Sequence, residues 1–389
     1  MRFNKIVYIG YFPLTSTVFE EYYFETLLKN NITVEYLDVT NLFFSKKTDS
    51  NSFNFSGIVS ISSYKEVKDY FRRQNNSDTL YISFIGFEWR AVKLFRLLTK
   101  YNLTVGVFGR GVFPSVYTSK TSKYLFNLKK INFNRLKIFI QNRLAKLSKT
   151  VGYVKTYDYI FKAGEFGHFA FGYGCDIDIL KASILDVNTV DYDKYLLEKR
   201  KNEHFEEKAA VYLDQYFPYH PDTLYFNIKT VEPDRYYKEL NTWFDIFERQ
   251  TGKKVIIAAH PKALRYNVSN PFEGREIVFN KSNELVKNAS VVLTHNSTAV
   301  CYPICYGKKL VLLTNKHLED TFWDYTLSIN AIKNACGATI ICMDNDETNI
   351  PADIDYKAYD DYKYKYLTSK SSEDRTTEEI FLNFILNGS

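Results

Sequence analysis

Two short polar motifs in the second half of the chain have residue types suited to binding a phosphate. His260 and Pro261 directly follow the apolar run VIIAA, and Asn296, Ser297 and Thr298 come shortly after the run VVLT. An imidazole N–H donates to a phosphate oxygen, and proline fixes the direction of the loop. Polar side chains that start a helix lie beside backbone N–H groups that attract anions. Together these groups can stabilise a departing phosphate without a metal.

Each motif also has a simpler interpretation. A His-Pro pair is often only a turn, and a Ser-Thr pair often only caps a helix. The spacing favours a shared site, because Ser297 lies 37 residues after His260 (297 − 260), which leaves room for one strand–helix passage. Two adjacent parallel strands would then end at the same edge of a sheet and bring the motifs together.

The elements around the second motif have the pattern of a strand, a loop, a helix and a strand. Val291 to Leu293 is apolar and β-branched, a helix-like segment stops at Gly307, and Leu310 to Leu313 is a second apolar run. Gly307 suits the position just past a helix end, where a left-handed conformation is common. Other strands are predicted at residues 6–9, 33–37, 80–85, 103–108, 159–162, 209–213, 254–258, 277–279 and 338–342, and helices at residues 18–29, 89–98, 233–251, 282–288 and 376–386.

Strands that alternate with helices predict an α/β fold, and 389 residues are enough for two domains. We therefore expect two doubly wound parallel sheets facing a central cleft, where strand-end loops bind ligands. No GxGxxG pattern follows the first strand, so a plain dinucleotide-binding fold is not supported. The expected boundaries are a first domain at 1–190, a linker at 191–208, a second domain at 209–372 and a closing helix at 373–389. The chain becomes charged and loses strand character over residues 185–204, and the linker is predicted to be a helix with exposed charge.

Two carboxylates are candidates for a general base. Asp214 directly follows the strand predicted at 209–213, although it can equally cap the turn after that strand. Glu165 lies in the glycine-rich segment from Gly164 through Gly167 to His168, after the last strand of the first domain. A flexible loop with a carboxylate and a histidine suits the binding of an acceptor substrate. The choice between Asp214 and Glu165 stays open at this point.

Metal-binding patterns are weak in this chain. Three DxD patterns, at residues 176–178, 344–346 and 353–355, are short enough to arise by chance in acidic loops, and we expect no metal site from them. The five cysteines show no CxxC pair and no spacing with histidine typical of zinc. This cysteine usage favours a reducing compartment.

A basic segment at residues 110–150 is predicted as an insertion in the first domain. Ten Lys or Arg residues and no Asp or Glu lie between Arg110 and Lys149, interleaved with aromatic and aliphatic residues. Such a segment is typical of contact with an anionic membrane face, although a solvated helix face has the same composition. We do not expect nucleic acid as a partner. The net charge of +6 and the short first apolar run, which reads as a strand, favour a cytoplasmic protein that is peripheral at the membrane.

The second half of the chain resembles the donor half of bacterial GT-B glycosyltransferases that synthesise surface polysaccharides. The resemblance is carried by HP at 260–261, THNSTA at 294–299 and YGK at 306–308. It is closest to enzymes that use CMP-activated acidic sugars: sialyl-, pseudaminic-acid- and Kdo-type transferases. It implies a GT-B-like fold with an acceptor-side first domain. It also implies transfer of an acidic sugar from a CMP-linked donor to a glycan hydroxyl in capsule or lipopolysaccharide synthesis, without a metal.

The resemblance also implies roles for individual residues. His260, Ser297 and Thr298 would hold the CMP phosphate with Pro261 and Asn296 beside them, and Arg110 would meet the sugar carboxylate. The family's acidic motif is matched imperfectly by Glu165-Phe166-Gly167 and by Asp214-Gln215. Three alternatives remain: a transferase that uses CDP-glycerol, a UDP-sugar epimerase of the same fold, and a non-catalytic glycan-assembly protein.

Overall fold

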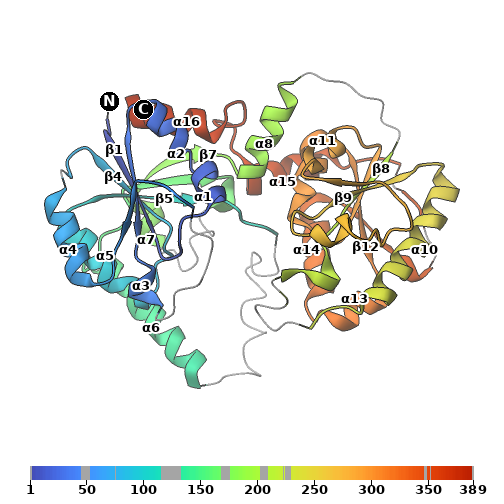
Figure 1. Cartoon of the computed structure of the whole chain (residues 1–389), viewed down its shortest axis with the longest axis horizontal. Helices are drawn as coiled ribbons and strands as arrows, with labels where there is room; N and C mark the ends of the chain where they lie inside the picture. The colour runs from blue at the N-terminus through green and yellow to red at the C-terminus, as the bar shows by residue number, and fades with distance from the viewer. Residues whose placement is uncertain are drawn as a thin grey trace. The chain divides into compact units, whose positions relative to one another are not determined.

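The structure is a computed structural model that describes residues 2–44, 53–74, 76–114, 133–167, 176–201, 209–221, 223, 229–345, 348–350 and 352–387. The chain divides into two compact units, and each is described by itself. The first unit is built on residues 2–112, 133–190 and 368–387, and the second on residues 191–367. Figure 1 shows a sheet with helices around it in each unit.

The first unit contains a seven-stranded sheet in the order β3-β2-β1-β4-β5-β6-β7, with parallel pairing throughout. Its strands are β1 (Lys5–Gly10), β2 (Thr33–Asp38), β3 (Ile58–Ser60), β4 (Thr79–Ser83), β5 (Thr104–Gly109), β6 (Tyr159–Ala163) and β7 (Ser183–Val187). Its helices are α1 (Ser16–Glu21), α2 (Phe24–Lys29), α3 (Thr40–Phe43), α4 (Tyr64–Arg73), α5 (Val92–Lys100), α6 (Phe133–Thr150), α7 (Asp176–Lys181) and α16 (Thr377–Asn387).

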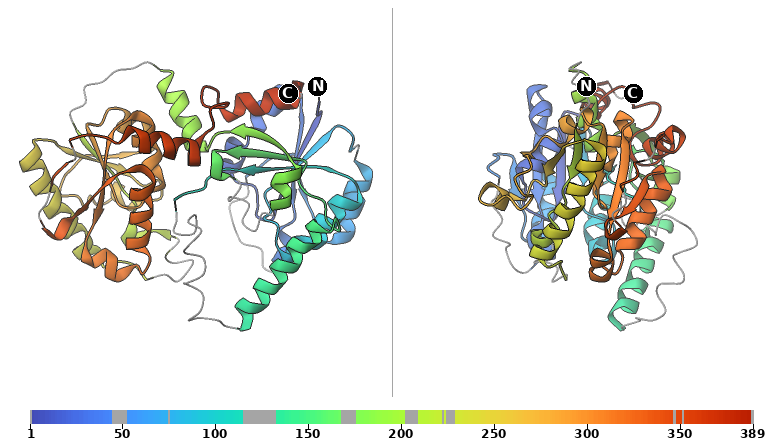
Figure 2. Two further views of the ribbon diagram at one scale, coloured as in Figure 1. Left: turned by 180° about the vertical axis from the view of Figure 1, so that it is seen from behind. Right: turned by 90° about the vertical axis from the view of Figure 1, so that its right-hand side faces the viewer.

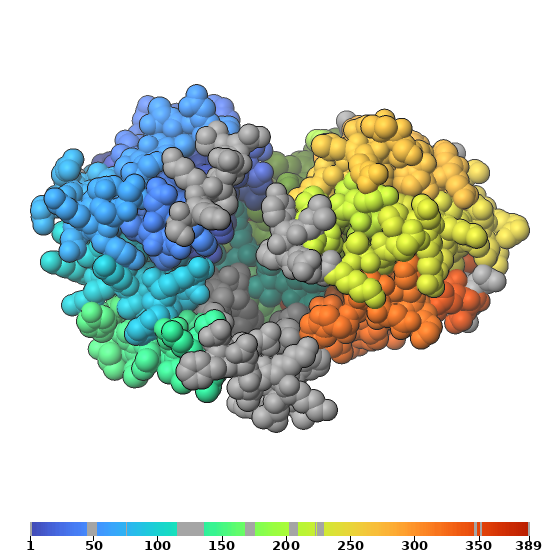
Figure 3. Space-filling model, turned by 60° about the horizontal axis from the view of Figure 1, so that its bottom comes forward, coloured from blue at the N-terminus to red at the C-terminus, as the bar shows by residue number. Residues whose placement is uncertain are grey.

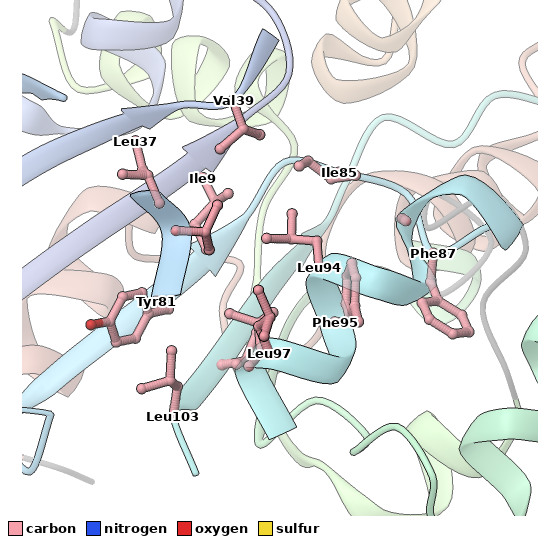
Figure 4. Close-up of a cluster of buried hydrophobic side chains, with 14 of the residues drawn as sticks. Ile9, Leu37, Val39, Tyr81, Ile85, Phe87, Leu94, Phe95, Leu97 and Leu103 are labelled. Atoms are coloured by element: carbon pink, nitrogen blue, oxygen red, sulfur yellow. The ribbon is translucent and has the colours of Figure 1, made fainter. Parts of the chain in front are cut away.

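Apolar side chains cover both faces of the first sheet, as a doubly wound fold requires. On one face, Leu94 and Leu97 of α5 pack with Ile9 and Leu37 of the strands, as Figure 4 shows. The other face is covered by α1, α2 and α16 through a second apolar cluster. The helix α16 lies beside α2 (Figure 1, Figure 2), where Glu378 accepts a hydrogen bond from Thr26. The carboxyl-terminal helix is therefore part of the core of the first unit.

The second unit contains a six-stranded parallel sheet in the order β10-β9-β8-β11-β12-β13. Its strands are β8 (Ala210–Leu213), β9 (Val255–Ala259), β10 (Ile277–Phe279), β11 (Val291–Thr294), β12 (Lys309–Thr314) and β13 (Thr339–Cys342). The helices are α8 (Val190–Lys199), α10 (Pro233–Thr251), α11 (Ser282–Lys287), α12 (Cys301–Tyr306), α13 (Lys316–Thr321), α14 (Tyr325–Cys336) and α15 (Tyr356–Tyr362). In Figure 3 the yellow-green surface of α10 adjoins the orange surface of the segment that contains α13, and the Glu239 carboxylate accepts from Asn315 at 2.9 Å there.

The predicted α/β fold with two doubly wound, Rossmann-like sheets of the GT-B-like plan is confirmed by these two parallel sheets. The predicted central cleft depends on how the two units are placed relative to each other, so it stays a prediction. Two strands were not expected from the sequence. β7 begins at Ser183 and contains Asp186, where the sequence suggested a loss of strand character, and β3 has only three residues. Both are edge strands, which tolerate polar residues because one side has no neighbouring strand.

Two segments differ from the sequence-based expectation. The single helix expected at 18–29 is two helices, α1 and α2, because Tyr23 between them adopts a left-handed backbone with φ of 63°. The helix expected in the linker at 191–208 is present as α8, but it buries Tyr192, Tyr195 and Leu196 and groups with the second unit rather than being exposed throughout. The closing segment groups with the first unit from residue 368 onward.

Candidate functional site

A pocket of about 690 Å³ lies at the carboxyl ends of β8, β9, β10 and β11 in the second unit. The structure brings five of the candidate residues together in its lining: Asp214, His260, Pro261, Ser297 and Thr298. These residues come from the loops after three strands that are neighbours in the sheet, in the order β9, β8 and β11. The edge of a parallel sheet where strands end is the usual ligand site of this kind of fold.

The backbone fixes the tautomer of His260. The N–H of Lys262 donates to Nδ1 of His260 at 3.2 Å. A nitrogen that accepts a hydrogen bond carries no proton, so the neutral ring has its N–H at Nε2. The carbonyl of His260 accepts from the N–H of Ala263 at 2.8 Å, which begins a tight turn. The Nε2–H of the neutral ring is therefore a hydrogen-bond donor that a phosphate oxygen can accept.

A second imidazole lies next to this one. The ring centroid of His220, in the loop after β8, is 4.9 Å from that of His260, with the rings nearly perpendicular. The sequence contains a matching His-Pro pair at 220–221, in the segment after the strand predicted at 209–213, and this pair was not chosen as a site. Its repetition of the His260-Pro261 pattern was the signal that could have drawn attention to it.

Ser297 and Thr298 begin the helical segment after β11. Ser297 Oγ accepts from the N–H of Ala299 at 3.2 Å and caps a 3₁₀ turn, Thr298–Val300, that leads into α12. The capping interpretation therefore holds for Ser297, and a hydroxyl that accepts one bond can still donate its proton to a ligand. Thr298 is an exposed residue in the pocket lining.

Asn296 is not among the residues that line the pocket, and its expected part in donor binding stays a prediction. Its backbone N–H donates to Gln215 Oε1 at 2.8 Å, and Gln215 Nε2 donates back to its Oδ1 at 2.8 Å. Its Nδ2 also donates to Ser328 Oγ at 3.1 Å. These bonds tie the loop after β11 to the loop after β8. Asn296 thus helps to fix the positions of two loops that border the pocket.

Asp214 is a buried residue of the pocket lining and is surrounded by donors. Its Oδ1 accepts from the N–H of Tyr216 at 3.0 Å, and its Oδ2 accepts from the hydroxyl of Tyr266 at 3.0 Å. Burial raises the pKa of Asp214 to about 6, against hydrogen bonds that include one from the backbone N–H of His260. The carboxylate therefore joins the loops after β8 and β9, which agrees with the alternative that it stabilises the turn.

The helix α8 supplies a wall of the pocket that the sequence did not indicate. Lys194, Glu198 and Lys201 line it together with Tyr302 of α12, whose hydroxyl donates to Asp191 Oδ1 at 3.0 Å. These residues were missed because 191–208 was interpreted as a linker. The apolar spacing within α8, at residues 192, 195 and 196, was the signal for a packed helix.

The pocket as a whole does not carry a strong positive charge. Three lysines line it, but so do four carboxylates, and Glu198 pairs with Lys201 at 2.7 Å and with Lys287 at 3.7 Å. General charge attraction therefore does not select an anion here. Selection of an anion has to come from the local donors at the strand ends, namely His260 and the hydroxyls of residues 297 and 298.

His295, in the same motif, has a structural role. It is fully buried, its Nδ1 lies 2.8 Å from the carbonyl oxygen of Leu313, and its Nε2 lies 3.2 Å from the hydroxyl of Tyr236. Because burial disfavours the charged ring, the pKa of His295 is lowered to about 4. The ring is neutral at physiological pH and holds β11 against β12 below the pocket.

The acceptor-binding residues expected from the sequence belong to the first unit. Gly164 has φ of +64°, and a Cβ at Gly167 would lie 2.4 Å from the carbonyl oxygen of Gly109. Both glycines are thus required by the turn that follows β6, which passes close to the end of β5. Glu165 is exposed in that turn, and His168 lies outside the described residues.

Arg110 is held in a different pocket, of about 370 Å³, in the first unit. Its guanidinium donates to the carbonyl oxygen of Glu21 at 2.6 Å and to the Tyr23 hydroxyl at 3.0 Å, and it lies 4.4 Å above the Tyr22 ring. The pocket is rich in aromatic residues from the ends of β1, β4 and β5. Arg110 belongs to the first unit and the candidate phosphate ligands belong to the second, so its expected contact with the sugar carboxylate stays a prediction.

The acidic DxD patterns have structural contacts. Asp178 pairs with the buried Lys149 at 2.9 Å, Asp344 accepts from the N–H of Lys316 at 2.8 Å, and Asp355 caps α15. Within the described ranges, no group of three or more His, Cys, Asp or Glu side chains is arranged to hold a metal ion.

The comparisons with known proteins give only distant structural likenesses. No protein-family model matches the chain, and no curated protein matches it at a significant level. A UDP-GlcNAc 2-epimerase from Methanocaldococcus jannaschii, in complex with UDP-GlcNAc and UDP, is 15% identical over 99% of this chain and 99% of its own, with a TM-score of 0.43.

Two further solved structures are similar over most of the chain. A variant of the wall teichoic acid polymerase TagF is 13% identical over 98% of this chain and 83% of its own, with a TM-score of 0.44. The calicheamicin glycosyltransferase CalG4 is 11% identical over 100% of both chains, with a TM-score of 0.47. At these identities and scores the fold assignment rests on the two parallel sheets themselves.

Proposed function

We propose that the chain is a glycosyltransferase whose second-unit pocket binds the phosphate of a nucleotide-activated sugar. The observation that carries this proposal is the convergence of His260, Ser297 and Thr298 in one pocket at the strand ends. Following the motif resemblance, we propose a CMP-linked acidic sugar as the donor and a glycan hydroxyl of capsule or lipopolysaccharide as the acceptor.

The proposed transfer breaks the bond between the anomeric carbon and the phosphate oxygen. The bonding electrons go to that oxygen, and negative charge develops where His260 Nε2–H and the hydroxyl of Thr298 donate. Preorganised donors directed at developing charge lower the barrier without a metal. The acceptor oxygen forms the new bond to the anomeric carbon, and its proton goes to a carboxylate. Asp214 and Glu165 stay the two candidates for this base, and Asp214 already accepts bonds from a backbone N–H and a tyrosine hydroxyl.

The proposal is tested by incubating the full chain with CMP-, CDP- and UDP-activated donors and acceptor glycans, with EDTA present, and measuring nucleotide release. Release of CMP is expected. Replacing His260 with Ala should lower this release by about 100-fold or more, with an unchanged melting temperature. Lys254→Ala, at the opposite end of β9, is the matched control and should retain activity.

The other outcomes identify the alternatives. Release from UDP donors alone, or a strict requirement for a divalent ion, would reject the CMP-dependent reaction. Glycerol phosphate transfer from CDP-glycerol would identify the glycerophosphotransferase, and conversion of a UDP-sugar without an acceptor would identify the epimerase. If no nucleotide raises the melting temperature, the chain is a non-catalytic protein.

A further inference from the structure

The helix α6 presents an apolar stripe to solvent. Leu136, Ile140, Leu144, Leu147 and Val151 follow one another at spacings of four, four, three and four residues, and each is between 45% and 68% exposed. This spacing places the five side chains along one side of the helix. A run of large apolar side chains left half exposed in this way marks an interaction surface.

The opposite side of α6 docks the helix onto the first unit. Asn142 Oδ1 accepts from the N–H of Trp89 at 3.1 Å, Ala145 is buried, and the buried ammonium of Lys149 pairs with Asp178 at 2.9 Å. These inward contacts set the rotation of the helix. The apolar stripe is therefore held outward by the fold, and the amino-terminal half of α6 extends beyond the sheet (Figure 2).

The charges around the stripe are all positive. Residues 133–151 contain five Lys or Arg and no Asp or Glu. Among the basic side chains of this segment that the structure describes, only Lys149 is buried in the inward ion pair. The guanidinium of Arg143 lies 5.0 Å from the centre of the Phe139 ring, so a cation lies directly beside an apolar side chain. Long basic side chains can extend toward phosphates while their stems lie on an apolar surface.

These features identify the partner. Two copies of α6 pairing through their stripes would bring like charges together, whereas anionic lipid head groups complement them. An apolar face bordered by Lys and Arg is typical of a helix lying in the plane of a membrane interface. Among the described residues, no helix is both long and apolar enough to cross a bilayer. We propose that α6 docks the protein onto the surface of an anionic membrane through Leu136, Ile140, Leu144, Leu147 and Val151. This proposal does not depend on the reaction that the second unit catalyses.

The test is flotation of the full chain with phosphatidylcholine vesicles that contain or lack phosphatidylglycerol. We expect binding to the anionic vesicles. High salt should weaken this binding, because salt screens the attraction between the basic side chains and the anionic head groups. The double variant Ile140→Ser, Leu147→Ser should bind at least about tenfold more weakly, since each apolar side chain contributes to insertion. Leu180→Ser, which removes a 79% exposed leucine of α7, is the matched control and should bind like the parent protein.

Two results would overturn the proposal. The first is equal binding by the double variant and the parent, measured with circular dichroism spectra that show both are folded. The second is that the parent does not bind vesicles but forms a dimer, detected by light scattering, and that the double variant is a monomer. The stripe would then join two copies of the protein. A third variant, Lys137→Glu with Arg143→Glu, should abolish the preference for anionic vesicles, and an unchanged preference would also contradict the charge argument.

Discussion

Replacing Asp214 with Asn should make the second unit more sensitive to acid. Two buried groups of this unit titrate in opposite senses. The pKa of His295 is lowered from 6.5 to about 4, so the unfolded chain takes up this proton first and stability falls as the pH falls through this window. The pKa of Asp214 is raised from 3.8 to about 6, so the folded protein takes up this proton first and stability rises as the pH falls.

The two effects partly offset each other in the parent protein. Between pH 7 and pH 5, linkage with these pKa values gives a loss of roughly 2 kcal/mol from His295 and a gain of about 1 kcal/mol from Asp214. The Asp214→Asn variant cannot titrate at this position and keeps only the loss. Its free energy of unfolding should therefore drop by about 1 kcal/mol more than that of the parent over the same interval.

The assay is urea unfolding at pH 7 and pH 5 at one ionic strength, followed by fluorescence of Trp243, which is buried in α10 of the second unit. Asp320→Asn is the matched control, because its side chain is 65% exposed and pairs with Lys316 of the same helix. The control should follow the parent at both pH values. An equal or smaller drop in the Asp214 variant would refute the assignment of opposing titrations.

Two stability predictions concern the first unit, and both can be measured by thermal denaturation. Gly167→Ala places a Cβ 2.4 Å from the carbonyl oxygen of Gly109 and should lower stability by about 1–3 kcal/mol; an unchanged melting temperature would contradict the clash. Lys149→Met leaves the Asp178 carboxylate buried without its cation and should lower stability by about 3–5 kcal/mol. Adding Asp178→Asn should recover part of that loss, and a double variant no more stable than the single one would count against a buried charge as the cause.

The sequence predicted the inner strands of both sheets because inner parallel strands are buried on both faces and read as apolar runs. The run VVLT matches β11, and KLVLLT contains the predicted strand within β12. The edge strands β10 and β13 of the second sheet were also predicted, whereas the edge strands β3 and β7 of the first sheet lack this signal. In β7, Ser183 and Ile184 are exposed and Asp186 is half-buried, so its pattern resembles a loop. The break between α1 and α2 was also hidden, because it depends on the backbone conformation of Tyr23.

The site was predictable where strand ends carried its residues. His260, Ser297 and Thr298 each follow an apolar run, so their positions in the pocket follow from the order of the strands. The contribution of α8 could not be inferred in this way, because a helix packs where tertiary contacts place it. The exchange of hydrogen bonds between Asn296 and Gln215 likewise joins loops 81 residues apart, and no local pattern indicates it.

The central claim is that His260 and Thr298 hold one nucleotide phosphate, and ¹⁵N-histidine NMR of the full chain titrated with CMP in the presence of EDTA tests it most directly. The His260 resonance is assigned by its absence from the His260→Ala spectrum, and we expect it to show the proton on Nε2 and to shift on addition of CMP. Thr298→Val should weaken CMP binding by about tenfold, as loss of a hydrogen bond to a charged group predicts. Binding of CMP that leaves the His260 resonance unmoved, with the same affinity in both variants, would contradict the claim.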